Sequence, residues 1–310
     1  RCFQGRGGTQ ITLPAIVTPN LARLLGLLIA EGVNRSTDQV RFVNDDSAVD
    51  DLFADLAQSE LGATVLRKRY KVNAEDLYIS SRALSVILER VFGFGIDTRS
   101  AQKRLPPQML QSPPQVQWAF LSGLFEGDAH IHLRTSSKRA KAQLYIEYTT
   151  ASERLARQVI GLLLRLGVFA TLREQRKRAT NARVPADRTY YAVYIYGTEQ
   201  LRAVAERLEF AGAKSAALVV LRNLPHAANP NLDLVPGVTP LVRAAAKLAN
   251  VSVKRHRAGR AKLAAYTEGR CEASRPGLLE VAEQIAALGT TPERAAPILA
   301  QLRALAESDI

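Results

Sequence analysis

The sequence is poor in cysteine and lacks long apolar runs. Its two cysteines, Cys2 and Cys271, are far apart and match no zinc-binding spacing, which excludes a disulfide framework and a cysteine-based metal site. No uninterrupted apolar stretch approaches the roughly 18 residues that a membrane-spanning helix needs, and no secretory leader is recognisable. We therefore expect a cytoplasmic protein in a reduced compartment, with no membrane partner.

Acidic residues are scarce relative to basic ones. The 310 residues include 42 Lys and Arg but only 29 Asp and Glu, which gives a net charge of +13. This surplus favours a polyanionic partner, and nucleic acid is the commonest one. The alternative is that the arginine content reflects a GC-rich or thermophilic source. With 47% hydrophobic residues, the chain is long enough for two or three domains with cores of their own.

Two apolar segments, residues 24–32 and 121–129, share one pattern: a glycine at the third position and a carboxylate at the eighth. The glycines are Gly26 and Gly123, and the acids are Glu31 and Asp128. Both segments are apolar on nearly all sides, which predicts buried helices. The glycines would let the two helix backbones touch, so that the acids emerge side by side. One such segment alone is usually a core helix with a glycine stop, but the repetition favours a paired site.

Two like charges in such a position repel each other unless a cation neutralises them. Paired carboxylates presented to solvent are hard-oxygen ligands suited to Mg²⁺, which completes its coordination shell with water and phosphate oxygens. These are the requirements of metal-assisted phosphodiester hydrolysis. Glu31 and Asp128 are therefore the predicted metal ligands and catalytic acids.

The same series of elements follows each segment, as an internal repeat. In the first half we expect strands at 32–35, 39–43, 64–69 and 76–80, and helices at 47–61 and 82–92. In the second half we expect strands at 129–134, 143–148, 170–175 and 189–196, and helices at 152–166 and 198–208. Both halves then read α-β-β-α-β-β-α, which is an α+β fold.

Alternating polar and apolar residues in these strands indicate sheets with one face covered by helices and the other open. Val40 and Phe42 would face the core, leaving Gln39 and Arg41 outside. An open face rich in Arg, Gln and Tyr suits the reading of DNA base edges, because Arg favours guanine and Gln favours adenine. Any single member is equally well an ordinary solvated residue. The predicted DNA-binding residues are Arg35, Gln39, Arg41, Arg67, Arg69, His132, Arg134, Gln143, Tyr145, Arg173, Gln175 and Tyr190.

The paired segments resemble the LAGLIDADG motif of homing endonucleases, in the single-chain form with two copies. The resemblance covers about residues 18–222 and implies two αββαββα subdomains, 18–112 and 113–222, related by pseudo-twofold symmetry and forming a saddle over double-stranded DNA. It implies a monomer that makes a double-strand break in a long asymmetric target, with Mg²⁺ as cofactor and Mn²⁺ or Ca²⁺ able to substitute in binding. Two alternatives on the same fold are a noncatalytic DNA-binding regulator and an RNA maturase. Retention of both acids favours the enzyme.

The resemblance also implies further catalytic positions. A basic side chain near the scissile phosphates follows the last helix of each subdomain, and Lys103 and Lys214 are the nearest matches. A polar residue at the end of the second strand holds a water, and the candidates are Asp46, acidic where an amide is more usual, and Thr149. Each of these four is otherwise an ordinary surface residue. Glu126 lies within the second motif but should face away from the partner helix, so it receives no metal role.

The rest of the chain divides into an N-terminal extension (1–17), a linker rich in Pro and Asn (223–238) and a C-terminal helical module (239–310). In the module we expect helices at 239–249, 276–288 and 291–306, with a basic stretch at 254–262. The module either adds phosphate contacts in a helix-turn-helix manner or acts as a helical buttress. The chain's last residues resemble the segment that joins endonuclease and splicing blocks in many inteins, which suggests an intein-derived endonuclease domain.

Overall fold

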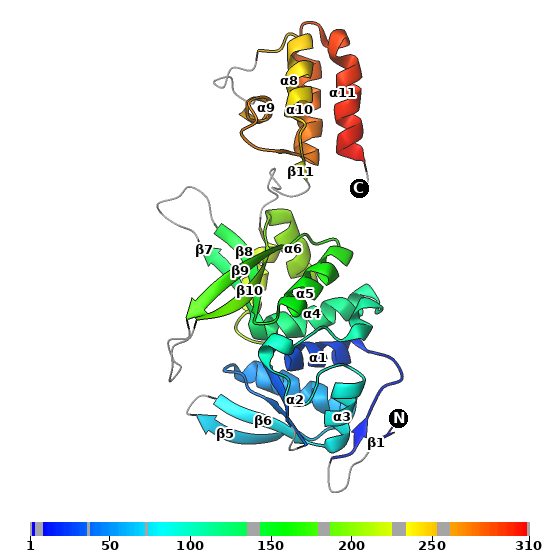
Figure 1. Ribbon diagram of the computed structural model, residues 1–310, viewed down its shortest axis with the longest axis vertical. Coiled ribbons are helices and arrows are strands. Elements are labelled where there is room, and N and C mark those ends of the chain that lie inside the picture. Colours follow the sequence, from blue (N-terminus) through cyan, green and yellow to red (C-terminus); the bar gives the residue numbers. More distant parts are fainter. Residues whose placement is uncertain are drawn as a thin grey trace. The chain divides into compact units, whose positions relative to one another are not determined.

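The structure is a computed structural model that describes residues 2–3, 9–35, 38–71, 74–134, 143–178, 187–224, 234–252 and 261–308. The chain divides into two compact units, residues 1–225 and 226–310, which are drawn in Figure 1. The boundary falls within the stretch predicted as a linker. In the part of the chain that the structure describes, no helix combines the length and apolar character needed to cross a membrane.

The first unit contains two copies of one arrangement. The first copy consists of α1 (Pro19–Glu31), β3 (Gly32–Arg35), β4 (Gln39–Phe42), α2 (Ser47–Leu61), β5 (Leu66–Lys71), β6 (Ala74–Ser80) and α3 (Arg82–Arg90). The second copy consists of α4 (Pro114–Asp128), β7 (Ala129–Arg134), β8 (Gln143–Thr150), α5 (Glu153–Arg165), β9 (Thr171–Arg178), β10 (Asp187–Ile195) and α6 (Thr198–Arg207). The two antiparallel sheets have matching strand orders, β3-β4-β6-β5 and β7-β8-β10-β9. The predicted α-β-β-α-β-β-α order and the α+β class are therefore confirmed.

Shorter elements complete this unit, and the sequence did not predict them. They are β1 (Cys2–Phe3), β2 (Ile11–Thr12), the 3₁₀ turns η1 (Ser100–Gln102) and η2 (Pro107–Leu110), and α7 (Ser215–Arg222). Helix α7 packs on α6. The segment between α3 and α4, which contains both 3₁₀ turns, leads from one repeat to the other.

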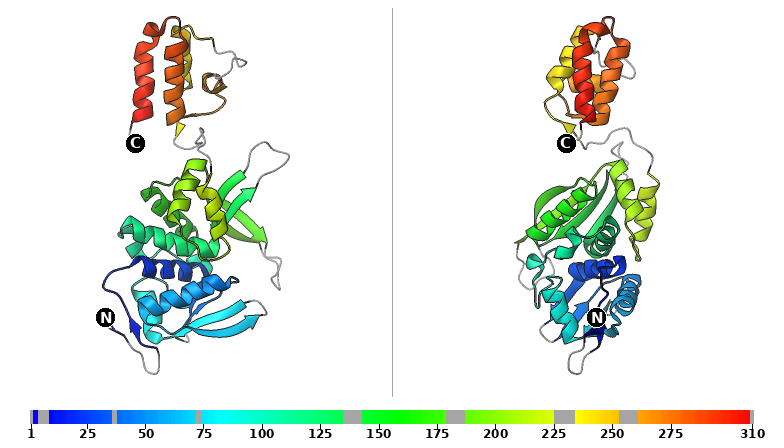
Figure 2. Two further views of the ribbon diagram at one scale, coloured as in Figure 1. Left: turned by 180° about the vertical axis from the view of Figure 1, so that it is seen from behind. Right: turned by 90° about the vertical axis from the view of Figure 1, so that its right-hand side faces the viewer.

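Helices α1 and α4 lie side by side in the middle of the unit, with one sheet on each side of the pair (Figures 1 and 2). Helix α1 begins where the Thr18 side chain accepts a hydrogen bond from Leu21 N at 3.0 Å, with Pro19 in the first turn. Each helix turns directly into a strand, at Gly32 for α1 and at Ala129 for α4. The acid that ends each helix therefore lies at the edge of a sheet.

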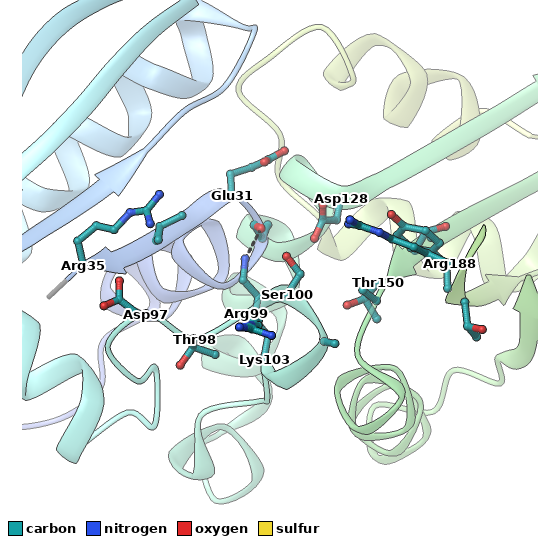
Figure 3. Close-up of a pocket in the computed structure, with 17 residues that line it drawn as sticks. Glu31, Arg35, Asp97, Thr98, Arg99, Ser100, Lys103, Asp128, Thr150 and Arg188 are labelled. Carbon is teal, nitrogen blue, oxygen red and sulfur yellow. Dashed lines mark hydrogen bonds between the residues drawn. The ribbon is translucent and has the colours of Figure 1, made fainter. Parts of the chain in front are cut away.

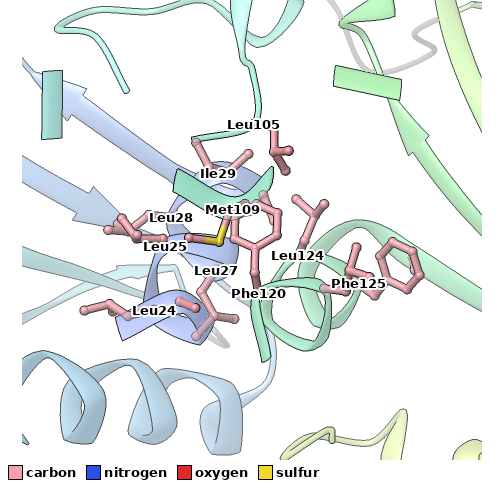
Figure 4. Close-up of a cluster of buried hydrophobic side chains, with 14 of the residues drawn as sticks. Leu24, Leu25, Leu27, Leu28, Ile29, Leu105, Met109, Phe120, Leu124 and Phe125 are labelled. Atoms are coloured by element: carbon pink, nitrogen blue, oxygen red, sulfur yellow. The ribbon is translucent and has the colours of Figure 1, made fainter. Parts of the chain in front are cut away.

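One hydrophobic core runs through both repeats. Its centre is the α1–α4 contact, where the leucines of α1 are at most 3% exposed and Phe120, Leu121, Leu124 and Phe125 of α4 are fully buried. Figure 4 shows these side chains meeting, with Leu105 and Met109 from the connecting segment packed against them. Each fully buried Leu or Phe stabilises the fold by about 1.5–3 kcal/mol. The two repeats are consequently held together by the motif helices themselves.

The second unit has a separate core. It consists of α8 (Thr239–Leu248), α9 (Ala261–Thr267), α10 (Arg275–Leu288) and α11 (Pro292–Glu307), with the short strands β11 (Leu234–Val235) and β12 (Ala273–Ser274) paired to each other. The three helices predicted here are present. Residues 254–260 of the predicted basic stretch lie outside the described residues, so a DNA-contacting role for this module stays a prediction.

Candidate functional site at the helix crossing

The two motif helices cross with their backbones in contact. A Cβ atom added at Gly26 would overlap the carbonyl oxygen of Phe120 and lie 2.7 Å from Leu124 N. A Cβ added at Gly123 would overlap the carbonyl oxygen of Arg23. Only glycine allows this approach on both sides, so the close crossing predicted from the two glycines is confirmed.

The crossing brings the two motif acids together at one end of the helix pair. Glu31 is the last residue of α1 and Asp128 the last of α4, and both line a single hollow of about 880 Å³ together with Lys103 (Figure 3). The Glu31 side chain passes over Gly127, where an added Cβ would lie 3.0 Å from Glu31 Cγ. The small residue before Asp128 thus makes room for the opposing acid.

Both motif acids have raised pKa values in this site. Burial, followed by the negative charge of Glu31, raises the pKa of Asp128 to about 7, although Lys103 and Lys214 act in the opposite direction. Burial also raises the pKa of Glu31, again against the two lysines. Because a raised carboxyl pKa means that the ionised form is disfavoured, the site would gain from a cation of higher charge.

The two lysines predicted from the resemblance both lie at this site. Lys103 Nζ donates to the carbonyl oxygen of Ala30 at 2.8 Å, and Lys214 Nζ donates to those of Glu126 and Gly127 at 2.6 and 3.0 Å. Each ammonium group thus caps the C-terminal end of one motif helix, where the helix dipole is negative. Burial lowers the pKa of both lysines, while Asp128 is the largest influence that raises it.

The structure separates the two residues predicted to hold water. Gly32 and Ala129 are equivalent, because each directly follows its motif helix. Gly32 pairs with Phe42 and Ala129 pairs with Tyr148, so Phe42 and Tyr148 occupy the same position in the two repeats. Asp46 therefore corresponds to Ser152, and both residues are N-caps, of α2 and α5. The prediction that Asp46 and Thr149 are equivalent second-strand positions is wrong.

Asp46 and Thr149 also differ in their surroundings. The Asp46 carboxylate accepts backbone hydrogen bonds from Ala48 N at 3.0 Å and Ala213 N at 2.6 Å. Thr149 lines the large hollow and donates to Glu147 Oε1 at 3.1 Å. The contacts of Asp46 brace the segment that contains Ala213, and of these two residues only Thr149 lines the large hollow.

The open faces of the two sheets contain most of the predicted DNA-binding residues. In the first sheet, Val40 and Phe42 are fully buried and Gln39 and Arg41 alternate with them on the opposite face. Arg35 shares that face with Arg41. In the second sheet, register from the buried residues Ile131, Tyr148 and Val193 places five candidates on the open face, namely His132, Tyr145, Arg173, Gln175 and Tyr190. The side chains of Arg134 and Gln143 lie outside what the structure describes, so their DNA contacts stay a prediction.

Two predicted residues lie on the other face. Arg67 and Arg69 pair with Leu77 and Glu75, whose side of the sheet is the helix-covered one. Arg67 accordingly forms an ion pair at 2.6 Å with Asp51 of α2. Their predicted placement on the open face is wrong because β5 has an exposed leucine, Leu66, on the open side, which inverts the apparent alternation.

Sequence reasoning missed several open-face residues of the second sheet. His132 stacks on Tyr145 with ring centroids 4.5 Å apart, and Tyr194 stacks on Tyr196 at 5.6 Å. The Arg173 guanidinium lies 5.3 Å from the Tyr194 ring centroid. The missed residues are His130, Lys177, Tyr194 and Tyr196. Strand alternation places His130 with His132 in β7, and Tyr194 with Tyr190 in β10, so that signal was available for these two.

Glu126 has no role in the sequence-based prediction, and the structure corrects its predicted surroundings. It is 2% exposed and accepts hydrogen bonds from the backbone of the segment that carries Lys214. Arg23 of the partner helix reaches it at 3.4 Å. Because these contacts lie 85 or more positions apart in the chain, no local pattern reveals them.

Comparison with known proteins agrees with this architecture. Residues 115–209, which run from α4 through α6, match the family model described as the LAGLIDADG-like domain. The replicative DNA helicase DnaB of Rhodothermus marinus is 30% identical over 241 residues, covering 72% of this chain and 24% of the relative. A DNA gyrase subunit from Mycobacterium gordonae is 30% identical over 233 residues, covering 72% of this chain and 38% of the relative.

A crystal structure of I-DmoI in complex with DNA and Mn aligns with 63% of this chain and 98% of that one, at 15% identity and a TM-score of 0.42. The chain spans less than two fifths of the length of the two named relatives. The family match falls on the second repeat, and the first repeat has the same order of elements and the same motif pattern, so the chain contains a LAGLIDADG-like domain.

Proposed function

We propose that this protein is a site-specific homing endonuclease that makes a metal-dependent double-strand break in a long asymmetric DNA target. The observation that carries the proposal is the meeting of Glu31 and Asp128 at the ends of two helices in backbone contact. Lys103 and Lys214 cap the same two helix ends. A noncatalytic DNA-binding protein on this fold would have no use for two partly buried acids whose ionisation is unfavourable.

The acid pair fits a divalent cation. Its donors are hard oxygens, and burial raises the pKa of both carboxyl groups in spite of the two lysines, so a bound cation would favour their ionised forms. Among the described residues, no group of three or more His, Cys, Asp or Glu is placed to hold a metal. The rest of the coordination shell would therefore come from water and DNA phosphate oxygens, as Mg²⁺ prefers. A bound ion would activate a water molecule and stabilise the leaving oxygen.

The lysines would act on the DNA backbone at the same place. Each ammonium group is held by the carbonyl oxygens of one helix end, which fixes its position relative to the acids. An ammonium group so placed attracts a phosphate and offsets the charge that develops on it during cleavage. One lysine per repeat supplies one such group for each DNA strand.

The two open faces predict an asymmetric target. The first sheet presents Arg35, Gln39 and Arg41, whereas the second presents aromatic residues such as His132 and Tyr145 beside Arg173. Because these side chains offer different hydrogen-bonding and stacking groups, each sheet would read a different half-site. A single chain provides both sheets, so we propose that the protein acts as a monomer.

The pattern of relatives supports an intein-derived origin. Each of the two named relatives matches about seven tenths of this chain, but the matched region is only a minor part of the relative's own length. Their names denote a helicase and a component of a gyrase, which are otherwise different proteins. A segment shared in this way is explained by an inserted element carried within unrelated hosts.

Cleavage selection tests the proposed function. A supercoiled plasmid library with a randomised insert is incubated with the protein and Mg²⁺, and linear product is recovered and sequenced. We expect one long asymmetric sequence to be enriched, and Asp128→Asn or Glu31→Gln to abolish the linear product. The surface variant Glu153→Gln serves as the matched control. Specific binding without cleavage in Mg²⁺ or Mn²⁺ would contradict the proposal and support a noncatalytic regulator.

A further inference from the structure

The backbone of the segment 209–214 between α6 and α7 is held by polar side chains of other elements. Glu126 of α4 accepts hydrogen bonds from Ala211 N at 3.0 Å and from Gly212 N at 2.9 Å. Ser122, one turn earlier on α4, accepts a hydrogen bond from Glu209 N at 3.0 Å. Lys214 lies at the end of this segment, so its backbone is fixed by a side chain of the motif helix that it caps.

The Glu126 charge is balanced from the other repeat. Arg23 of α1 approaches Glu126 Oε2 at 3.4 Å and also donates to the carbonyl oxygen of Glu209 at 2.9 Å. Its side chain is 15% exposed and that of Glu126 is 1% exposed. Hydrogen bonds to an ionised acceptor in such surroundings are stronger than neutral ones, so the contact constrains the segment effectively.

The same segment is also tied to the first repeat. The Asp46 carboxylate, at the start of α2, accepts a hydrogen bond from Ala213 N at 2.6 Å. A Cβ added at Gly212 would lie 2.8 Å from both Asp46 Cγ and Val49 Cγ2. Two carboxylates from different repeats therefore accept hydrogen bonds from the three successive N–H groups of residues 211–213.

The first repeat positions its lysine differently. The α1 residues that correspond to Ser122 and Glu126 are Leu25 and Ile29, which are at most 2% exposed. Figure 4 shows both beside Leu105 and Met109 of the segment that follows Lys103. The backbone of the Lys103 segment is held by uncharged side chains, through a hydrogen bond from Ser152 Oγ to Lys103 O at 2.7 Å and one from Leu105 N to Gln158 Oε1 at 3.0 Å. Apolar packing thus replaces the buried charge.

We propose that Glu126 is a positioning residue for Lys214, and that only the second repeat's lysine depends on a buried charge. This inference rests on the proposed endonuclease function, because Lys214 serves one DNA strand and Lys103 the other. Weakening the Glu126 contacts releases the Lys214 segment while leaving Lys103 and the acid pair in place. Cleavage of one strand then slows more than cleavage of the other.

The test uses a supercoiled plasmid that carries the sequence recovered by selection, with each strand end-labelled in separate reactions. We expect Glu126→Gln to slow cleavage of one strand about tenfold, the loss typical of one charge-assisted hydrogen bond, so that nicked plasmid accumulates. Lys214→Met should slow the same strand, and Lys103→Met the other. Glu126→Asp should restore part of the rate. The matched control is Glu209→Gln, whose exposed side chain touches only Arg23 in this cluster and should change either rate by less than about threefold.

Two further measurements keep the inference separate from the proposed function. Gly212→Ala displaces the segment from Asp46 without touching the helix core, and it should slow the same strand as Glu126→Gln. Amide hydrogen exchange in the DNA-free protein should show faster exchange at residues 211 and 212 in Glu126→Gln than in the unaltered protein. Unchanged exchange, or equal slowing of both strands, would overturn the inference. A protein that never cuts DNA yet shows the exchange effect would refute the endonuclease and leave the positioning contact standing.

Discussion

Replacing Asp128 with Asn should stabilise the protein that lacks metal while abolishing its cleavage of DNA. The side chain keeps its size but loses the charge that lies buried beside Glu31. In the metal-free protein that charge is unfavourable, because burial and the neighbouring acid both raise the pKa of Asp128. A site that binds a cation is expected to be destabilising when the cation is absent.

The size of the effect follows from the two pKa values. The pKa of Asp128 is about 7 in the folded protein and 3.8 in a solvated chain, and this difference corresponds to about 4 kcal/mol. The folded state therefore holds the Asp128 proton more tightly, so this carboxyl group's contribution to stability is fully present below about pH 4 and is lost as the pH rises through about 7. Lys103 and Lys214 both lose a favourable partner in the variant, which reduces the expected gain to between about 1 and 3 kcal/mol at pH 8. No gain is expected at pH 4.

Thermal unfolding in EDTA, followed by tryptophan fluorescence, measures this effect. The chain has one tryptophan, Trp118, which lies in α4 and so reports on the unit that contains the site. The unfolding midpoint of Asp128→Asn should rise by at least about 2 °C at pH 8. Glu153→Gln, on the surface of α5, is the control and should leave the midpoint unchanged. A variant that is less stable at pH 8, or equally stabilised at pH 4 and pH 8, would refute the electrostatic reasoning.

Three other predictions concern the crossing, the open face and the metal. Gly123→Ala forces a Cβ into the Arg23 carbonyl oxygen and should destabilise the fold by at least about 3 kcal/mol in denaturant unfolding. The control is Gly161→Ala, at a helix position with open space, which should stabilise the fold by about 0.5–1 kcal/mol. Similar effects of the two substitutions would contradict the backbone contact. Arg41→Ala should weaken DNA binding by about 1–3 kcal/mol with one half-site only, while Arg67→Ala, whose partners are Asp51 and Glu75, should leave the half-site preference unchanged in competition binding. Because metal ligands must be ionised, Mg²⁺ affinity measured by calorimetry should rise between pH 6 and pH 8 in step with the deprotonation of Asp128; a pH-independent affinity would argue against this ligand.

The predictable parts of this fold are those that depend on residues close together in the sequence. Gly26 and Gly123, together with the acids five positions later, were enough to place the crossing and the site, because helix geometry carries one position to the next. Strand phase was predictable in β4 and β10, where buried and open residues alternate. It failed in β5, where Leu66 is exposed and the residues that follow it are mostly charged.

Contacts between distant segments were not predictable in this way. The roles of Glu126 and Ser152 depend on backbone groups 49 to 86 positions away. Nothing in the residues next to them specifies which loop they hold. The resemblance to a family supplied Lys103 and Lys214 but not the side chains that position them.

The glycine contact between α1 and α4 has a consequence for how this protein changes over time. Since main-chain atoms set the spacing of the two helices, leucines and phenylalanines around the crossing are free to be exchanged for other apolar residues of similar volume without moving the acids. If the sheets read the DNA target as we propose, its recognition is then able to diverge while the spacing of the two acids stays constant. Such a separation suits an element that must follow a drifting target sequence.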